Sequence, residues 1–236
     1  AGMTPKEQLK ALAPEVKKFI QAQYSTYNRS LLPALKKAGV KVVEKHEELT
    51  EDQQAFVDQY FEESVYPVLT PMAMDSARPF PLIRNKTLNI GALIAKKGKK
   101  DKEELEFATV QVPSVLPRII EIPGNKEDKT TVVLLEEIIE RNIGKLFLSN
   151  TVVCACPYRI IRNADLTIDE DEAADLLTEI EKQLKKRQWG EVIRLDVEEK
   201  MDPRLLKILK MEFDVKEEDI HYINGPLDLT FLMKMY

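Results

Sequence analysis

Five arginines beside prolines or at the ends of expected strands are the side chains with the clearest chemical meaning. They are Arg78, Arg84, Arg118, Arg159 and Arg162. A guanidinium presents its N–H donors in a planar fork that matches the oxygens of phosphate groups. We therefore take Arg78, Arg84, Arg159 and Arg162 as candidate contacts for an anion. Each arginine taken singly is also typical of a surface residue or an ion pair.

Other charged runs carry weaker signals. The lysine-rich stretch 96–102 reads as a hairpin tip that could attract phosphates by charge alone, although lysines at such tips also serve solubility. The acidic runs 169–172 and 198–199 could bind a cation or act as acid and base. We expect instead that the first begins a helix and that the second is a solvated turn.

Cysteine and histidine are scarce. Cys154 and Cys156 would share one face of a strand, as small buried or half-buried side chains. Two cysteines are too few for a disulfide framework, and this favours a reducing cytoplasm. A zinc site would need further ligands. His46 and His221 have no recognisable partner motif and are expected to be ordinary surface or interface histidines.

Composition excludes several classes of protein. The 236 residues are 44% hydrophobic, enough for a folded core of one large or two small domains. The net charge of −5 argues against nucleic acid as a partner, and no apolar run is long enough for a transmembrane segment. Only eight glycines are present and no glycine-rich phosphate loop is found. We therefore assign no catalytic residue and no metal ligand.

The first 66 residues are expected to be helical. Thr4 and Glu7 form a capping box, and Gly39 should end the first helix. Pro14 and Pro33 should kink or split it. The apolar stripe of this helix comprises Leu9, Leu12, Val16, Ile20, Tyr24, Tyr27, Leu31 and Leu35.

A second helix should begin at Thr50, with Gln53 completing its capping box, and end near Tyr66. Its apolar face comprises Phe56, Val57, Tyr60, Phe61 and Val65. We expect these two helices to pack as an antiparallel hairpin. Prolines then follow closely from residue 67, where we place a domain boundary that separates residues 3–66 from residues 67–236.

The second part alternates strand-like and helix-like patterns. Strands are expected over residues 87–95, 105–112, 118–122, 130–134, 151–161, 193–197 and 221–224. Helices are expected over residues 134–142, from Asp169, and after the cap Asp202, with a final short helix within 226–233. The fold class is therefore α+β: a helical hairpin followed by a mixed α/β domain with helices packed on a largely antiparallel sheet.

Several sequence blocks, in the same order, resemble the long bacterial polyphosphate kinases. The segment from Tyr66 to Pro81 is similar to that family's "P-L-L-T-P…D-P…H-P-F-P" stretch. Further similar blocks are Asn85–Asn89 ("N-x-S-L-N"), Val112–Arg118 ("V-P…L-P-R"), Tyr158–Leu166 ("F-R-V-T-R-x-A-D-L"), Asp169–Ala173, Gly190–Leu195 and Gly225–Leu229. No block is decisive alone, but together they cover residues from about 15 to 236.

The resemblance implies a function. Members of this family reversibly transfer the terminal phosphate of ATP to inorganic polyphosphate through a phosphohistidine, with Mg²⁺. It implies that residues 3–66 are later helices of the N-terminal domain and residues 67–236 the head domain, through which a homo-oligomer forms. It also implies a cytoplasmic protein, with membrane association of the whole complex left open.

Departures from the family pattern limit what the resemblance transfers. Ser76 and Arg78 replace the proline and histidine of the "D-P-x-H-P" element, and Leu148-Ser149 stands where "P-G" is common. The family's opening block and its C-terminal catalytic domains are not found here. We therefore expect an inactive structural or dimerisation portion with no ATP or Mg²⁺ bound.

Two alternatives stay open. The chain could be a stand-alone protein-interaction module without enzymatic activity. The head domain could also guide polyphosphate by means of the basic stretch 96–102 and the arginines.

Overall fold

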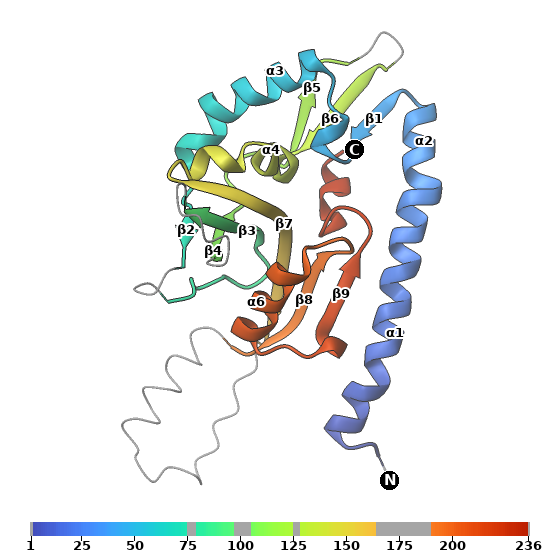
Figure 1. Cartoon of the computed structure of the whole chain (residues 1–236). Helices are drawn as coiled ribbons and strands as arrows, with labels where there is room; N and C mark the ends of the chain where they lie inside the picture. Colours follow the sequence, from blue (N-terminus) through green and yellow to red (C-terminus); the bar gives the residue numbers. More distant parts are fainter. Residues whose placement is uncertain (1, 75–78, 97–104, 125–127, 164–189, 236) are drawn as a thin grey trace.

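The computed structural model describes residues 2–74, 79–96, 105–124, 128–163 and 190–235. In these ranges the chain forms two sheets with helices packed around them (Figure 1). The expected α+β class is confirmed. Arg78, the acidic run 169–172 with its expected helix, and residues 97–102 of the basic tip lie outside the described ranges. No described helix combines the length and apolarity needed to cross a bilayer.

The larger sheet has six strands in the order β2-β4-β3-β7-β8-β9. They are β2 (Met72–Ala73), β3 (Leu88–Lys96), β4 (Leu105–Gln111), β7 (Asn150–Arg162), β8 (Val192–Glu198) and β9 (Ile220–Ile223). Neighbouring strands are antiparallel except β8 and β9, which are parallel. The 13-residue strand β7 pairs with β3 on one side and β8 on the other. The strands expected in these regions are confirmed to within one or two residues.

The smaller sheet has three strands in the order β1-β6-β5. They are β1 (Val40–Val43), β5 (Ile119–Ile122) and β6 (Thr130–Leu134). β1 runs parallel to β6, whereas β5 is antiparallel to it. β5 and β6 lie where strands were expected from the sequence, whereas β1 was not predicted, because four residues directly after a helix carry too little periodicity.

Both expected capping boxes are confirmed. α1 (Pro5–Thr26) begins at Thr4, whose hydroxyl oxygen accepts a hydrogen bond from the Glu7 backbone N–H at 3.3 Å. α3 (Glu51–Tyr60) begins at Thr50, whose hydroxyl oxygen accepts a hydrogen bond from the Gln53 backbone N–H. The Gln53 side-chain oxygen in turn accepts one from the Thr50 backbone N–H. These caps satisfy N–H groups that have no partner inside the helix.

The prolines of the first helix behave differently from each other. α1 continues through Pro14, so this proline does not split the helix, and a kink there stays a prediction. A π-helical turn, Tyr27–Leu31, instead precedes α2 (Leu32–Lys37), which contains Pro33. A proline ring clashes with the preceding turn, and a wider turn relieves that clash. The expected stop at Gly39 is confirmed by its φ of +87°.

The expected helical hairpin is wrong. α1 and α3 lie on opposite sides of the molecule, and β1 lies between them in the chain (Figure 1). The buried end of α1 packs with Ile223 and Phe231, near the end of the chain. α3 packs in a different core, with the central strand β3. The pairing of β1 with β6 therefore prevents the short connection from folding the helices onto each other.

Seven further helical segments lie in the described residues, besides the π-helical turn Phe61–Val65 that continues α3. α4 (Leu135–Arg141) follows β6 directly, and α6 (Pro203–Phe213) begins at the expected cap Asp202. The final helix is a 3-10 helix, Leu229–Lys234. Shorter 3-10 segments are His46–Glu48, Tyr66–Val68, Ile143–Leu146 and Glu217–Asp219.

Each face of the larger sheet has its own core. Ile90 and Ala92 of β3 face the core that contains α3 and α4. Leu93, on the opposite face, packs in the core that contains α6. This division follows from the alternation of side chains along a strand.

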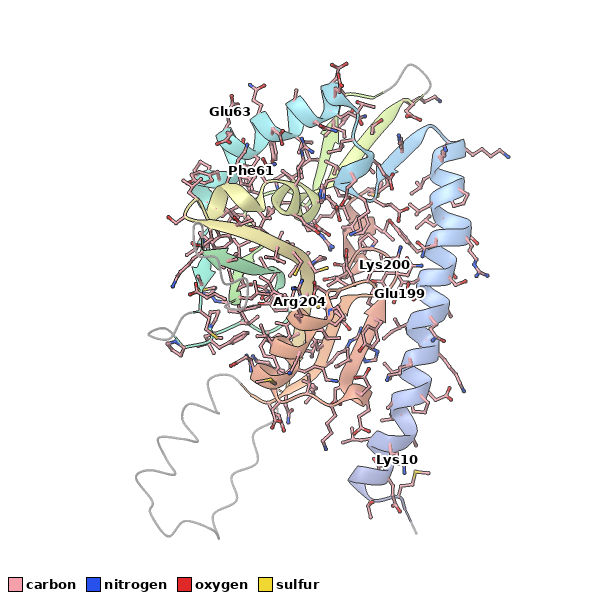
Figure 2. The ribbon with its side chains drawn as sticks, in the orientation of Figure 1. Lys10, Phe61, Glu63, Glu199, Lys200 and Arg204 are labelled. Carbon is pink, nitrogen blue, oxygen red and sulfur yellow. The ribbon has the colours of Figure 1, made fainter. Side chains whose placement is uncertain are left out.

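The N-terminal half of α1 leaves its apolar stripe exposed. Leu9 and Leu12 are 69% and 56% exposed, whereas Ile20 and Tyr24 are buried. The expected stripe is therefore used for packing only at its C-terminal end. The exposed half, which carries Lys10, extends beyond the sheet (Figure 1, Figure 2).

Substitution of Gly91 by valine is expected to destabilise the chain by about 1–3 kcal/mol, because overpacking strains a dense core. A Cβ at Gly91 would lie 3.2 Å from the ring of Tyr158 and 3.4 Å from that of Phe107. At Gly144 a Cβ meets nothing within 4 Å, so Gly144→Val is the control. Urea unfolding measures both changes, and equal stabilities for the two variants would contradict the prediction.

Candidate functional site

A cavity of about 230 Å³ opens beside α4 and the end of β8. Six glutamates and two lysines line it, so its charge is predominantly negative: Glu44, Glu48, Glu136, Glu137, Glu198 and Glu199, with Lys45 and Lys200. The rest of the lining comes from the segment after β9 and from Pro157 of β7. Such a cavity favours cations over phosphate-bearing ligands.

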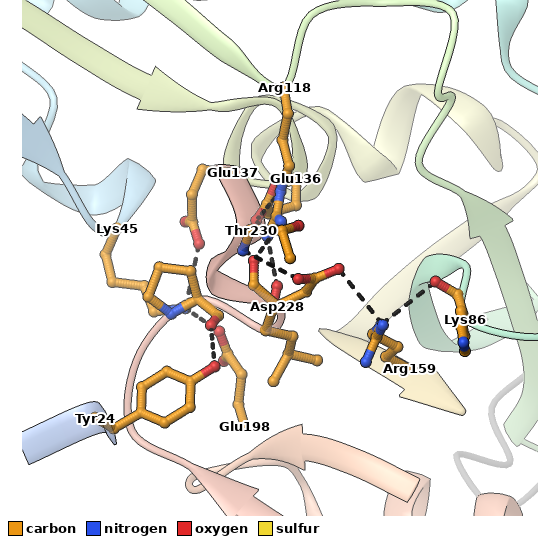
Figure 3. Close-up of polar contacts among 12 residues, drawn as sticks. Tyr24, Lys45, Lys86, Arg118, Glu136, Glu137, Arg159, Glu198, Asp228 and Thr230 are labelled. Atoms are coloured by element: carbon orange, nitrogen blue, oxygen red, sulfur yellow. Dashed lines mark hydrogen bonds and ion pairs between the residues drawn. The ribbon is translucent and has the colours of Figure 1, made fainter. Parts of the chain in front are cut away.

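Lys45 connects two elements that border this cavity. Its Nζ donates to Glu198 Oε1 and lies 3.4 Å from Glu137 Oε1 (Figure 3). The side chains of Glu137 and Glu198 are only 5% and 16% exposed. Burial alone lowers the pKa of Lys45, but the carboxylates of Glu137 and Glu198 outweigh it and raise that pKa above its ordinary value.

Arg118 joins α4 to the end of the chain. Its guanidinium contacts both carboxylate oxygens of Glu136, with Nη2 donating to Oε1 at 2.6 Å. It also donates to the backbone oxygens of Leu227 and Asp228 at 2.5 and 2.6 Å (Figure 3). Burial raises the pKa of Glu136, and Arg118 opposes that rise. All these groups hold one another in place.

Two more contacts extend the network. The Tyr24 hydroxyl of α1 donates to the Pro226 oxygen at 2.6 Å. Arg159 of β7 donates to the Lys86 oxygen at 3.3 Å, and its Nη2 lies 3.5 Å from Asp228 (Figure 3). The segment after β9 is thereby tied to both α1 and the larger sheet.

Three of the four candidate anion contacts, Arg84, Arg159 and Arg162, meet at the turn formed by residues 83–86. Arg84 is exposed on that turn. Arg162 donates to the Ile83 oxygen at 3.1 Å and the Gly190 oxygen at 2.9 Å, and Arg159 also meets protein oxygens. Because these donors are already engaged, Arg159 and Arg162 do not present a free cradle for the phosphates of ATP. An anion contact at the four arginines stays a prediction.

Of the two histidines, His221 differs from the expected surface position. His221 in β9 is only 8% exposed, and burial lowers its pKa, with the charge of Arg194 adding to the effect. The Nδ1 atom of His46 lies 3.3 Å from Glu137 Oε2. His221 is therefore not a surface residue. Cys156 and Cys154 are buried and half-buried, as expected.

The cavity and the residues around it were not predicted from the sequence. The expectation that residues 198–199 form a solvated turn is wrong for Glu198, which is largely buried against Lys45. No role was predicted for the two cavity-lining residues Lys45 and Glu137, or for Glu140. In the sequence, a lone lysine among glutamates looks like part of a solvated segment. Only the contacts of Lys45 with distant residues show that it joins two elements of the fold.

Comparison with known protein families identifies both parts of the chain. The family model described as polyphosphate kinase middle domain matches residues 52–235. The model described as polyphosphate kinase N-terminal domain matches residues 1–43. The domain boundary near residue 67 stays a prediction.

Curated relatives carry the same family name. A polyphosphate kinase from Halalkalibacterium halodurans is 44% identical over 100% of this chain and 33% of its own length. A polyphosphate kinase from Lactiplantibacillus plantarum is also 44% identical, over 100% of this chain and 32% of its own length. The chain therefore spans about a third of the length of these relatives.

A solved structure shares the fold. The crystal structure of polyphosphate kinase from Porphyromonas gingivalis superposes with a TM-score of 0.77, at 22% identity. The match covers 97% of this chain and 32% of that one. Since the middle-domain model alone covers most of the sequence, the chain belongs to the polyphosphate kinase family.

Proposed function

We propose that this chain is part of a polyphosphate kinase that reversibly transfers the terminal phosphate of ATP to polyphosphate through a phosphohistidine, with Mg²⁺. Within that enzyme we assign these residues a structural and dimerisation role rather than a catalytic one. The observation that carries this assignment is the mutual engagement of the charged groups around the cavity. Arg118, Lys45 and Arg159 all meet protein oxygens.

The surroundings of the histidines support a non-catalytic role. A phosphohistidine requires an imidazole nitrogen that the transferred phosphoryl group can reach. The carboxylates of Glu137 and Glu47 lie 3.3 and 3.5 Å from the ring nitrogens of His46 and would repel a phosphate. His221 is buried. The proposal therefore assigns the phosphohistidine to neither residue.

An activity assay tests the proposal. The 236-residue chain, incubated with ATP, Mg²⁺ and a polyphosphate primer, is expected to form no polyphosphate above background. A longer polyphosphate kinase from a relative serves as the positive control. ATP-dependent chain growth by these residues alone would overturn the proposed role.

Oligomerisation and location belong to the same proposal. We propose a cytoplasmic homo-oligomer that assembles through the head domain, residues 67–236, with residues 3–66 as helices of the N-terminal domain. Size-exclusion chromatography with light scattering should give a mass of two chains or more. The mass of a single chain at every concentration would argue against this assembly.

Polyphosphate contact is a second candidate function, and the exposed turn around Arg84 favours it. Arg84 and Lys86 are exposed on this turn, and the half-buried Arg159 and Arg162 donate to its backbone oxygens. We expect polyphosphate to bind at low salt and to bind less at moderate salt. Arg84→Ala should weaken binding several-fold, whereas Arg204→Ala on α6 should not. Absence of binding at low salt would contradict this candidate.

A further inference from the structure

One imidazole and two carboxylates converge beside the cavity. His46 begins the 3-10 segment His46–Glu48 that follows β1, and Glu137 and Glu140 lie one turn apart on α4. A potential ligand atom from each residue lies within 4.8 Å of the other two. Residues three apart share a face of a helix, which explains how both glutamates reach the same point.

One oxygen of the Glu140 carboxylate lacks a hydrogen-bond partner in the described part of the chain. This oxygen, Oε2, is buried. A buried acceptor without a partner is costly, and native structures nearly always supply one. The position therefore calls for a proton or a cation.

Glu137 is held in place for such a role. Its Oε2 accepts a hydrogen bond from the His46 backbone N–H at 3.1 Å and lies 3.3 Å from Nδ1 of the same residue. Its other oxygen faces Lys45 at 3.4 Å. The single segment after β1 therefore holds this carboxylate of α4, which is about 90 residues away in the sequence, before any ligand arrives.

Charge around the cluster also favours a cation. Lys45 is committed to Glu137 and Glu198, and the nearby carboxylates leave an excess of negative charge. The cavity lined by Glu137 gives an ion a route from solvent.

We propose that His46, Glu137 and Glu140 form a binding site for a divalent transition-metal ion of the Zn²⁺ or Mn²⁺ type. Imidazole and carboxylate together suit these ions, whereas Mg²⁺ prefers an all-oxygen octahedral shell. Such an ion would join the segment after β1 to α4, two elements that follow neighbouring strands of the smaller sheet. This site lies outside the phosphate-transfer reaction proposed above.

Metal titration of the metal-free 236-residue chain tests the site. Calorimetry with Zn²⁺ and electron paramagnetic resonance with Mn²⁺ should each give one bound ion per chain, and saturation should raise the melting temperature. Mg²⁺ should bind at least tenfold more weakly. Failure of both Zn²⁺ and Mn²⁺ to bind at millimolar concentration would overturn the proposal.

Matched variants locate the ion. Glu140→Gln and His46→Gln should each weaken Mn²⁺ binding at least tenfold, because each removes one ligand. Glu199→Gln, which makes the same change at an exposed position on the cavity wall, should leave binding unchanged. Melting in metal-free buffer shows that each variant is folded. Unchanged binding by both folded ligand variants would place the ion elsewhere and overturn the proposal.

Discussion

Replacement of Arg118 by methionine is expected to lower the free energy of unfolding by about 3–5 kcal/mol, because it leaves a buried carboxylate without its partner. The Glu136 side chain is 3% exposed, and Arg118 contacts both of its oxygens. The substitution also removes the donors to Leu227 and Asp228 and the cation over the Phe231 ring, 5.1 Å from its centroid. Urea unfolding followed by circular dichroism measures the loss.

Two controls separate this ion pair from ordinary surface pairs. Arg204→Met removes a pair with Asp202 whose arginine is 57% exposed, and should cost no more than about 1 kcal/mol. Adding Glu136→Gln to Arg118→Met should recover part of the lost stability, because the buried charge disappears with it. A loss for Arg118→Met as small as that for Arg204→Met would contradict the account of this junction.

Truncation of Phe61 to alanine is the second large expected effect, at about 3–5 kcal/mol. Phe61 is fully buried in the core between α3 and the sheets, with its ring centroid 6.0 Å from that of Tyr66. Removal of the ring leaves a cavity that the surrounding side chains can fill only in part. Thermal and urea unfolding report the change.

Phe19→Ala is the matched control. Phe19 lies on α1 and is 71% exposed, so its truncation should change stability by about 0.5 kcal/mol or less. Similar losses for Phe19→Ala and Phe61→Ala would mean that the core has been assigned to the wrong face of these helices.

Local features of the fold could be predicted because neighbouring residues determine them. Thr4, Thr50 and Asp202 cap their helices by bonding to groups two or three residues away, as the sequence indicated. Strand β3 followed from its apolar and branched residues. These signals need no knowledge of the rest of the chain.

Features set by distant contacts could not be predicted. The pairing of β1 with β6 joins residues about 90 positions apart, and it is the reason that the helical hairpin does not form. The stripe on α1 looks uniform in sequence, yet only its C-terminal end meets the segment after β9. Periodicity identifies an apolar face but does not say how much of it is covered.

The site shows the same limit. Arginines were singled out for the forked shape of their donors, but that shape serves protein oxygens at Arg159 and Arg162 as well as it would serve phosphate. Lys45 and Glu198 are 153 residues apart, and each looks solvated in its own local context. Their pairing depends on the way β8 and the segment after β1 meet.

Phosphate labelling tests the central claim most directly, namely that these residues give a polyphosphate kinase its structure and not its phosphate-transfer chemistry. The 236-residue chain is incubated with ATP labelled at the terminal phosphate and Mg²⁺, then analysed for acid-labile phosphate on histidine by mass spectrometry. The account predicts no label on His46 or His221. A stoichiometric phosphate on either residue, lost in the matching His→Gln variant, would contradict it.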